Sequence, residues 1–372
     1  MRQNIPLGRI MGIPLGLDFS WFLVFGLLTW MLAVSHYPAE FRDWPRLLYW
    51  FMGAVTAVLF FVSVVLHELG HSVVALRYKV PVHSITLFIF GGVARIGAEP
   101  PSAVAEFWIA IAGPIVSLVL AVLFSLAKPL VAGIEPLWGL TKYLSYINFA
   151  LLFFNLIPGF PLDGGRVFRA VVWGVTKNMR RATLLATGSG RVFGFLFIVF
   201  GVWQMLAGNF GGGLWIAFIG WFLENAASGQ AHQVAFQDLL AGHKVSEAMS
   251  DPCPSVSADL TLQQLVDRHI LGIGQRCFLV NRGSDTVGLM TLHLTKQVAR
   301  SDWESTTVEQ AMLPLDQLKH IHPDTELSAA LQEMNRDGFN QLPVMRRDNR
   351  IVGMLSRDDV ITFLQRLREL GE

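Results

Sequence analysis

The chain has 372 residues, of which 52% are hydrophobic and only 15% are charged, whereas about 25% of the residues in an average soluble domain carry a charge. Such an apolar excess cannot be enclosed in a soluble core, so part of the chain is expected to face the lipid bilayer. The net charge of +1 gives no indication of nucleic-acid binding. Residues 1–228 carry 15 basic and 9 acidic side chains, and residues 229–372 carry 14 and 19. This division predicts an apolar membrane region followed by a polar, acidic one.

Six apolar segments are candidates for membrane helices, which need about 20 residues each. They are Phe19–Ser35, Tyr49–Leu76, Val104–Leu126, Tyr143–Leu156, Gly188–Leu206 and Leu214–Leu223. The first and last are short. Prolines interrupt the fourth at Pro158 and Pro161, after which a short helix to Trp173 is expected. Such a break is tolerated at membrane depth where the freed backbone lines a protein cavity.

The short loops indicate the orientation, because cytoplasmic loops carry an excess of Lys and Arg. With the amino terminus inside, eleven of the 15 basic residues of this region lie on the cytoplasmic side and four outside. We therefore expect a multi-pass protein of the inner (cytoplasmic) cell membrane with both termini in the cytoplasm. Cys253 and Cys277 would then occupy a reducing compartment and are expected to be free thiols.

Two local patterns lie beside these spans. Ser84–Ile96 is β-branched and aromatic with Gly91-Gly92 in its middle, which predicts two short strands and a turn, although a plain loop fits the periodicity equally well. Gly190 and Gly194 are four residues apart in the fifth span, and we interpret them as close helix packing.

The second span contains His67-Glu-Leu-Gly-His71. Residues four apart share one face of a helix, so both imidazoles can reach one metal ion. Glu68 would then act as the general base on the water that the zinc ion acidifies. A surface helix can produce this pattern by chance, and a structural polar cluster is the alternative. Ionisable residues at membrane depth are expensive, however, and this favours a metal site.

A catalytic zinc site usually takes three protein ligands and leaves a position for water. His36, His83 and Glu106 flank spans, whereas Asp163 is the one carboxylate in the broken fourth span, within Asn155-Leu-Ile-Pro-Gly-Phe-Pro-Leu-Asp-Gly-Gly-Arg166. Alone, Asp163 would be interpreted as a turn residue or a helix cap. Beside a two-histidine site that lacks a ligand, Asp163 is predicted to be the third zinc ligand.

Together these motifs over residues 1–228 resemble the site-2 protease family of intramembrane metalloproteases, peptidase family M50. The resemblance implies one Zn²⁺ per chain held by His67, His71 and Asp163, with Glu68 as the base. It also implies that Asn155 helps to hold the substrate backbone, although Asn155 could instead be a helix-packing amide. The implied substrate is a membrane protein with a transmembrane helix, cleaved within or near that helix in regulated intramembrane proteolysis.

The polar half contains an internal duplication. Val245-Ser-Glu-Ala-Met249 is echoed by Val308-Glu-Gln-Ala-Met312, and Gly288-Leu-Met-Thr291 by Gly353-Met-Leu-Ser356. The repeated order of strands and helices resembles a pair of cystathionine-β-synthase-type (CBS) domains. We therefore expect a linker at 229–244, one CBS domain at 245–304 and a second at 305–372.

By the same resemblance, Ser356 and Asp359 of the second repeat are expected to bind the phosphate and ribose of ATP, ADP or AMP. The first repeat has Leu294 in place of the aspartate, so one nucleotide site is expected. The alternative is that Ser356 and Asp359 merely cap the last helix. Homodimerisation through the CBS domains is also an expectation.

The predicted fold is a polytopic α-helical membrane protein with about six transmembrane helices and a short β hairpin, followed by a cytoplasmic α/β tandem CBS domain. Two other classes of protein are alternatives. A CBS-regulated transporter or channel predicts polar residues spread along several spans, whereas here they gather in one place. An inactive membrane scaffold is disfavoured by the presence of Glu68.

Overall fold

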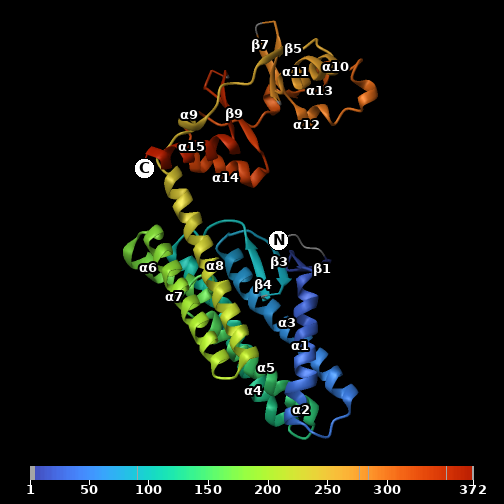
Figure 1. Cartoon of the computed structure of the whole chain (residues 1–372), viewed down its shortest axis with the longest axis vertical. Coiled ribbons are helices and arrows are strands. Elements are labelled where there is room, and N and C mark those ends of the chain that lie inside the picture. The colour runs from blue at the N-terminus through green and yellow to red at the C-terminus, as the bar shows by residue number, and fades with distance from the viewer. Residues whose placement is uncertain (1–4, 90, 276, 284, 349, 371–372) are drawn as a thin grey trace. The chain divides into compact units, whose positions relative to one another are not determined.

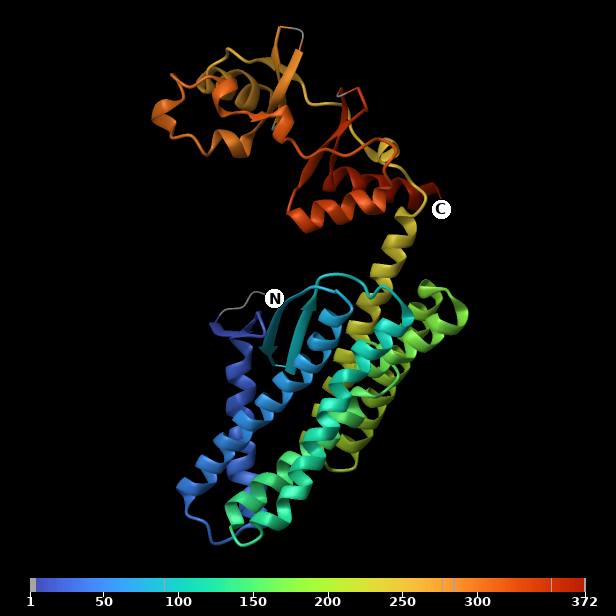
Figure 2. The ribbon, with the colours of Figure 1, turned by 180° about the vertical axis from the view of Figure 1, so that it is seen from behind.

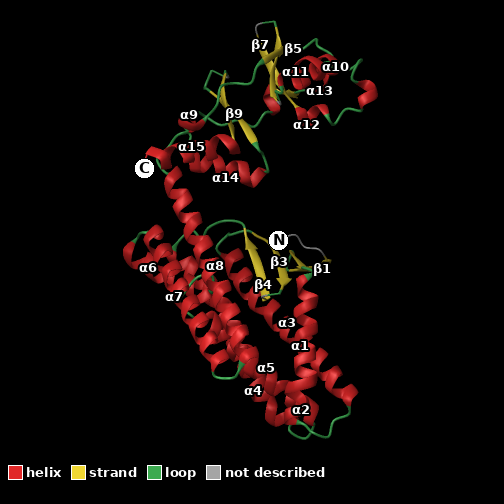
Figure 3. Cartoon of the chain, in the orientation of Figure 1, coloured by secondary structure: helices red, strands yellow, loops and turns green. Residues whose placement is uncertain are grey.

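A computed structural model describes residues 5–89, 91–275, 277–283, 285–348 and 350–370. The chain forms two compact units, Met1–Val234 and Ala235–Glu372. The first is mainly helical, and the second combines short helices with strands (Figure 3).

The first unit consists mainly of helices, several of them long, and the last one continues past Val234 (Figure 1). They are α1 (Ser20–Met31), the π-helix η1 (Leu32–His36), α2 (Tyr37–Glu40), α3 (Arg46–Arg77), α4 (Ala103–Ala127), the 3-10 helix η2 (Lys128–Val131), α5 (Glu135–Asn155), α6 (Asp163–Thr176), α7 (Met179–Leu206) and α8 (Phe210–Leu240). At 1.5 Å per residue, the 32 residues of α3 span about 48 Å. That length exceeds the roughly 30 Å hydrocarbon core of a bilayer.

Four stretches of the described residues are long and apolar enough to cross a membrane: Ser20–Glu40, Arg46–Arg77, Ala103–Val131 and Met179–Leu206. The predicted membrane region is therefore present. The predicted fourth and sixth spans fall in α5 and α8, which are long helices outside that set. The count of about six spans stays a prediction. Helix α8 continues to Leu240, so most of the predicted linker is helical.

A four-stranded sheet with the order β1–β2–β3–β4 accompanies these helices. The strands are β1 (Ile5–Ile10), β2 (Ile13–Leu17), β3 (Val82–Phe88) and β4 (Gly91–Ile96). The β3–β4 pair is antiparallel and confirms the predicted hairpin, although Gly91 and Gly92, expected in the middle of the segment, are the first residues of β4. Strand β2 pairs in parallel with β3, which the sequence analysis did not predict. The sheet and α6 lie towards the same end of this unit in both views (Figure 2).

Helices α7 and α8 approach each other along glycines. A Cβ on Gly194 would lie 2.9 Å from the carbonyl oxygen of Gly220, and one on Gly201 would lie 2.5 Å from the carbonyl oxygen of Gly213. Real Cβ atoms essentially never come that close, so each pair requires glycine. Small residues of this kind allow backbones to pack closely in membranes. The expected helix-packing role is thus seen at Gly194, whereas Gly190 packs against Phe160 in the loop between α5 and α6.

The second unit contains two similar halves. Its elements are α9 (Val245–Ala248), β5 (Ser255–Ser257), α10 (Leu262–Leu265), η3 (Val266–Ile270), α11 (Leu271–Ile273), β6 (Cys277–Arg282), β7 (Asp285–Thr291), α12 (Leu292–Thr295), η4 (Arg300–Asp302), α13 (Val308–Ala311), β8 (Leu313–Pro314), η5 (Leu315–Gln317), α14 (Leu327–Asp337), β9 (Gln341–Met345), β10 (Ile351–Ser356) and α15 (Arg357–Leu370). Strands β5–β6–β7–β8 form one sheet, and β9 and β10 form another.

The leading segment of each half packs in the other half. Val245 of α9 is buried in a core with Leu327 and Leu355, which follow much later in the chain. Conversely, Val308 of α13 is buried in the core that contains Leu262 of the first half. Exchange of these segments therefore joins the two halves into one body.

Cys253 and Cys277 form a disulfide with 5.8 Å between their Cα atoms, within the range usual for such bonds. The expectation of two free thiols was wrong. Its physical reason is the parallel pairing of β5 with β6, in which Ser255 lies opposite Leu279. Because Cys253 and Cys277 each stand two residues earlier, the same register places them side by side.

Candidate metal centre

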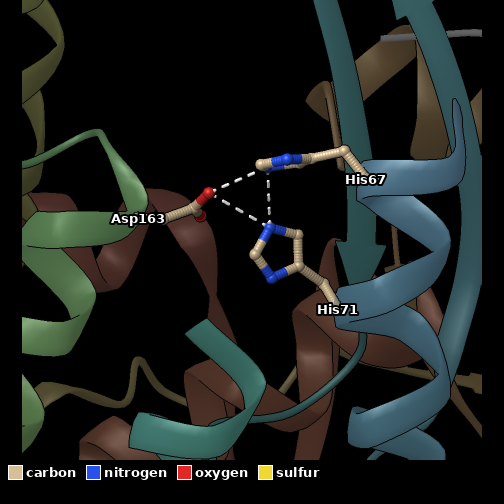
Figure 4. Close-up of side chains that lie close together, drawn as sticks. All are labelled: His67, His71 and Asp163. Atoms are coloured by element: carbon tan, nitrogen blue, oxygen red, sulfur yellow. Dashed lines mark hydrogen bonds and ion pairs between the residues drawn. The ribbon is translucent and has the colours of Figure 1, made fainter. Parts of the chain in front are cut away.

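Two histidines of α3 lie on one face of that helix and are almost completely buried. The exposed fraction is 3% for His67 and 4% for His71. Their Nε2 atoms are 3.2 Å apart. Figure 4 shows both rings pointing towards Asp163, whose Oδ2 lies 3.0 Å from His67 Nε2 and 3.1 Å from His71 Nε2. Three ligand atoms thus converge on one point.

Asp163 reaches this point because the chain breaks between α5 and α6. The loop that contains Pro158 and Pro161 replaces a continuous helix, and Asp163 is the first residue of α6. Helix α7 holds the loop: the N–H of Phe160 donates to the carbonyl of Ala186 at 3.1 Å. A Cβ on Gly190 would overlap the carbonyl oxygen of Phe160. Glycine at position 190 therefore leaves the space in which the loop before Asp163 packs against α7.

The outer nitrogen of each imidazole has a fixed partner on α4. His67 Nδ1 lies 2.8 Å from the hydroxyl of Ser117. His71 Nδ1 lies 2.7 Å from the carbonyl oxygen of Ile109, which can only accept, so this nitrogen carries the hydrogen. In the neutral ring, the lone pair of His71 is then on Nε2 and points at the convergence. Outer partners of this kind orient histidine ligands in metal sites.

The convergence fits a zinc ion. With zinc–ligand bonds of about 2.0–2.1 Å in a tetrahedral arrangement, ligand atoms stand about 3.3 Å apart. The three separations here are 3.0, 3.1 and 3.2 Å. In the neutral His71 ring, the Nε2 lone pair and the carboxylate oxygen of Asp163 would repel each other at 3.1 Å, and a shared cation removes that repulsion.

Room for the two rings is created on α4 by Gly113. A Cβ at this position would overlap His71 Nε2 and lie 2.6 Å from His67 Nε2. The next residue is Pro114, which lies inside α4. Because proline has no N–H, it leaves the carbonyl four residues earlier without its usual helical partner. The wall of the site on α4 is thus formed by a glycine, followed by a proline that removes one helical hydrogen bond.

Glu68 lies next to His67 and contacts the sheet. Its Oε2 accepts a hydrogen bond of 3.2 Å from the backbone N–H of Ala94 in β4. A Cβ on Gly92 would lie 2.5 Å from Cγ of Glu68, so that glycine is needed for the carboxylate to reach the strand. The resulting arrangement places one carboxylate between the histidine pair and the edge strand.

The structure brings His67, His71 and Asp163 together, and their role as zinc ligands stays a prediction. Asn155 is half-buried at the end of α5, and its role in holding the substrate stays a prediction. Sequence reasoning missed Ser117 and Gly113, which the local pattern alone does not distinguish from ordinary residues of an apolar helix.

In the second unit, the carboxylate of Asp359 is occupied by local hydrogen bonds. Its Oδ2 accepts from the N–H and the hydroxyl of Ser356, at 2.8 and 2.6 Å. The hydroxyl of Ser250 lies 3.4 Å from the same oxygen. These contacts match the capping alternative for α15, and the predicted nucleotide role is untested.

Two buried histidines on a helix long enough to cross a membrane, with Glu68 beside them and a carboxylate from α6 facing them, form the arrangement expected of a membrane metalloprotease. Profiles of known families agree: that of peptidase family M50 matches residues 55–133 and 127–200, and that of the CBS domain matches residues 304–366. The chain belongs to peptidase family M50, the site-2 protease family, and carries a CBS domain.

Relatives extend along almost the whole chain. The "putative zinc metalloprotease Rip3" of Mycobacterium tuberculosis is 34% identical over 368 residues, which cover 98% of this chain and 93% of the relative. The "putative zinc metalloprotease sll0528" of Synechocystis is 34% identical, with 98% and 96% covered. Among solved structures, the site-2 protease from Methanocaldococcus jannaschii is 29% identical and covers 61% of this chain and 94% of its own, with a TM-score of 0.43.

Proposed function

We propose that this protein is an intramembrane zinc metalloprotease that hydrolyses peptide bonds within or near the transmembrane segments of membrane-bound substrates. The observation that carries the proposal is the convergence of His67, His71 and Asp163 at 3.0–3.2 Å on α3 and α6. A zinc ion held there would supply Lewis-acid polarisation of the scissile carbonyl and a lowered pKa for the attacking water.

Glu68 is the proposed general base. It stands one residue after a histidine ligand, and so can take the proton of the attacking water and pass it to the leaving amine. Its hydrogen bond to Ala94 keeps the carboxylate facing the strand rather than the lipid. The backbone N–H of a fixed strand is a suitable holder, because it orients the carboxylate without neutralising it.

The substrate is expected to meet β4. A transmembrane helix must give up internal hydrogen bonds before a peptide bond becomes accessible, and each unsatisfied backbone group costs several kcal/mol in lipid. Within the described sheet, β4 is an edge strand, and the N–H of Ala94 points away from β3 towards Glu68. An unwound segment that adds to this edge beyond Ala94, whose N–H is already bonded to Glu68, would satisfy its backbone beside the proposed base. Asn155 is proposed to hold the substrate backbone as well.

We propose six spans in the inner (cytoplasmic) cell membrane, with both termini in the cytoplasm. The basic residues of the loops support this orientation. The sheet and α6 lie towards one end of the first unit (Figure 2), and this end would face the cytoplasm. The proposed site would then lie near the cytoplasmic side, where its products are released.

Regulation by an adenine nucleotide is a further part of the proposal. A ligand that binds at Ser356 and Asp359 would have to replace the hydrogen bonds that cap α15. This exchange offers a physical route by which binding changes the second unit. Calorimetry with ATP, ADP and AMP on the wild type and on Asp359→Ala tests the site, and cleavage rates with each nucleotide test the coupling. Dimerisation through the CBS domains is proposed likewise, and sedimentation tests it.

The main experiment combines metal content with cleavage. Purified wild-type protein should contain about one zinc per chain, and His67→Ala and Asp163→Ala should lose most of it. Glu68→Gln should keep the zinc and lose cleavage of single-span substrates in liposomes. Full metal in Asp163→Ala would refute the ligand set. Equal cleavage by Glu68→Gln and wild type would refute the base, and no cleavage by either would favour a scaffold or transporter.

A further inference from the structure

A buried ion pair joins the two helices that surround the metal centre. Glu106 of α4 is completely buried and Arg169 of α6 is 8% exposed. The Nε of Arg169 donates to Glu106 Oε1 at 2.7 Å, and its Nη2 donates to the same oxygen. Neither residue touches the convergence of His67, His71 and Asp163, and neither has a role in the proposed chemistry.

Stability alone is a weak reason for such a pair. The desolvation of two buried charges can exceed their mutual attraction, so apolar residues of similar volume are often as stable. Here the pair is also incompletely satisfied, because Glu106 Oε2 is buried and has no hydrogen-bond partner among the described residues. A buried unsatisfied group in a folded protein calls for an explanation.

The position of the Glu106–Arg169 pair suggests an explanation for its burial. Glu106 stands three residues before Ile109, whose carbonyl fixes His71. Arg169 stands six residues after Asp163, about 9 Å along α6. The guanidinium also lies over the ring of Phe160, 5.1 Å from its centroid, and Phe160 belongs to the loop that leads into Asp163. One side chain therefore holds α6 to α4 and braces the loop.

We propose that the Glu106–Arg169 ion pair is a positioning element that sets the carboxylate of Asp163 against the two imidazoles and thereby determines the affinity for zinc. The inference rests on the proposed metal site and adds two residues to it. Both act through other residues: Glu106 through α4 and Ile109, and Arg169 through α6 and the loop.

Zinc affinity measured by chelator competition on the full-length protein in detergent tests this role. Arg169→Met keeps the length of the side chain without its charge, and Glu106→Gln keeps the shape of the acid. Both should bind zinc up to about 10-fold more weakly, the lower end of the effect of losing a group that hydrogen-bonds a ligand directly, because these two residues act one contact further away. Arg169→Lys restores the charge and should recover part of the loss. Arg191→Met is the matched control, because the side chains of its pair with Glu224 are 59% and 35% exposed and the pair links other helices.

Thermal unfolding of the zinc-free protein separates positioning from general stability. Because removal of one partner leaves a buried charge unpaired and is itself destabilising, the double variant Glu106→Gln/Arg169→Met is the one to compare. A positioning role predicts that this double variant unfolds near the wild-type midpoint without zinc and gains less stability when zinc is added. Unchanged zinc affinity in both Arg169→Met and Glu106→Gln would overturn the inference, as would a loss that merely follows unfolding of the zinc-free protein. Failure of the wild type to bind zinc would instead refute the proposed function.

Discussion

Gly113 offers a sharp test of the site, because the change adds one methyl group where the imidazoles converge. In Gly113→Ala, the new Cβ would overlap His71 Nε2 and lie 2.6 Å from His67 Nε2. No ligand, charge or hydrogen-bonding group is removed. Any effect on zinc binding must therefore come from the space that the methyl group takes.

The magnitude follows from contact distances. Carbon and ring nitrogen pack at about 3.5 Å, so His67 would have to withdraw by about 0.9 Å from its present position. Metal–ligand distances tolerate only about 0.2 Å. The displacement is several times larger than that tolerance, and we expect zinc affinity to fall by at least about 100-fold, at or beyond the upper end of outer-partner effects.

Chelator competition on the detergent-solubilised protein measures this loss. Gly188→Ala is the matched control, since Gly188 also lies in a long helix and a Cβ there meets nothing within 4 Å. It should bind zinc like the wild type. Wild-type affinity in Gly113→Ala would show that α4 does not press against the ring nitrogens, and the described geometry of the site would be wrong.

Three other outcomes are expected. Ser117→Ala removes the Nδ1 partner of His67 and should weaken zinc binding about 10–100-fold in the same competition assay. Ser145→Ala is its control: the hydroxyl of Ser145 donates to a backbone carbonyl, and its loss should leave zinc binding unchanged. Gly201→Val should lower the free energy of unfolding by about 1–3 kcal/mol through overpacking of α7 against α8, as measured by denaturation in detergent. Reduction of the Cys253–Cys277 disulfide should destabilise the second unit by about 3.5 kcal/mol from chain entropy over a separation of 24 residues, and a double serine variant should make urea unfolding insensitive to reductant.

Much of the site was predictable because its chemistry is local. His67 and His71 are one helical turn apart, and their placement in an apolar segment leaves few alternatives. Asp163 required one long-range assumption, that a broken span returns to α3. The hairpin at Ser84–Ile96 was likewise predicted from its composition.

The rest depends on contacts between segments far apart in the chain. The pairing of β2 with β3 places Leu15 opposite Ile85, and the residue pattern within either strand does not predict which strand it pairs with. From the sequence, Glu106 was expected to flank a span, and Arg169 was only one of the eleven basic residues counted on the cytoplasmic side. In the structure the two are buried against each other. The cysteines were assigned by compartment, whereas the register of β5 and β6 decided their distance.

The exchange of leading segments in the second unit constrains the order in which it can form. Lys244 forms a β-bridge with Glu326, and Ser250 forms one with Met354. The start of this unit can therefore form its native contacts only after roughly the last fifty residues have been synthesised. Contacts of such large sequence separation slow folding, because chain closure precedes the stabilising contact. A nascent chain that ends at residue 304 would lack Val308 from the core of its first half, while Val245 would have no core to enter. The two halves therefore reach their native structure together rather than one after the other, although each resembles a complete domain in sequence.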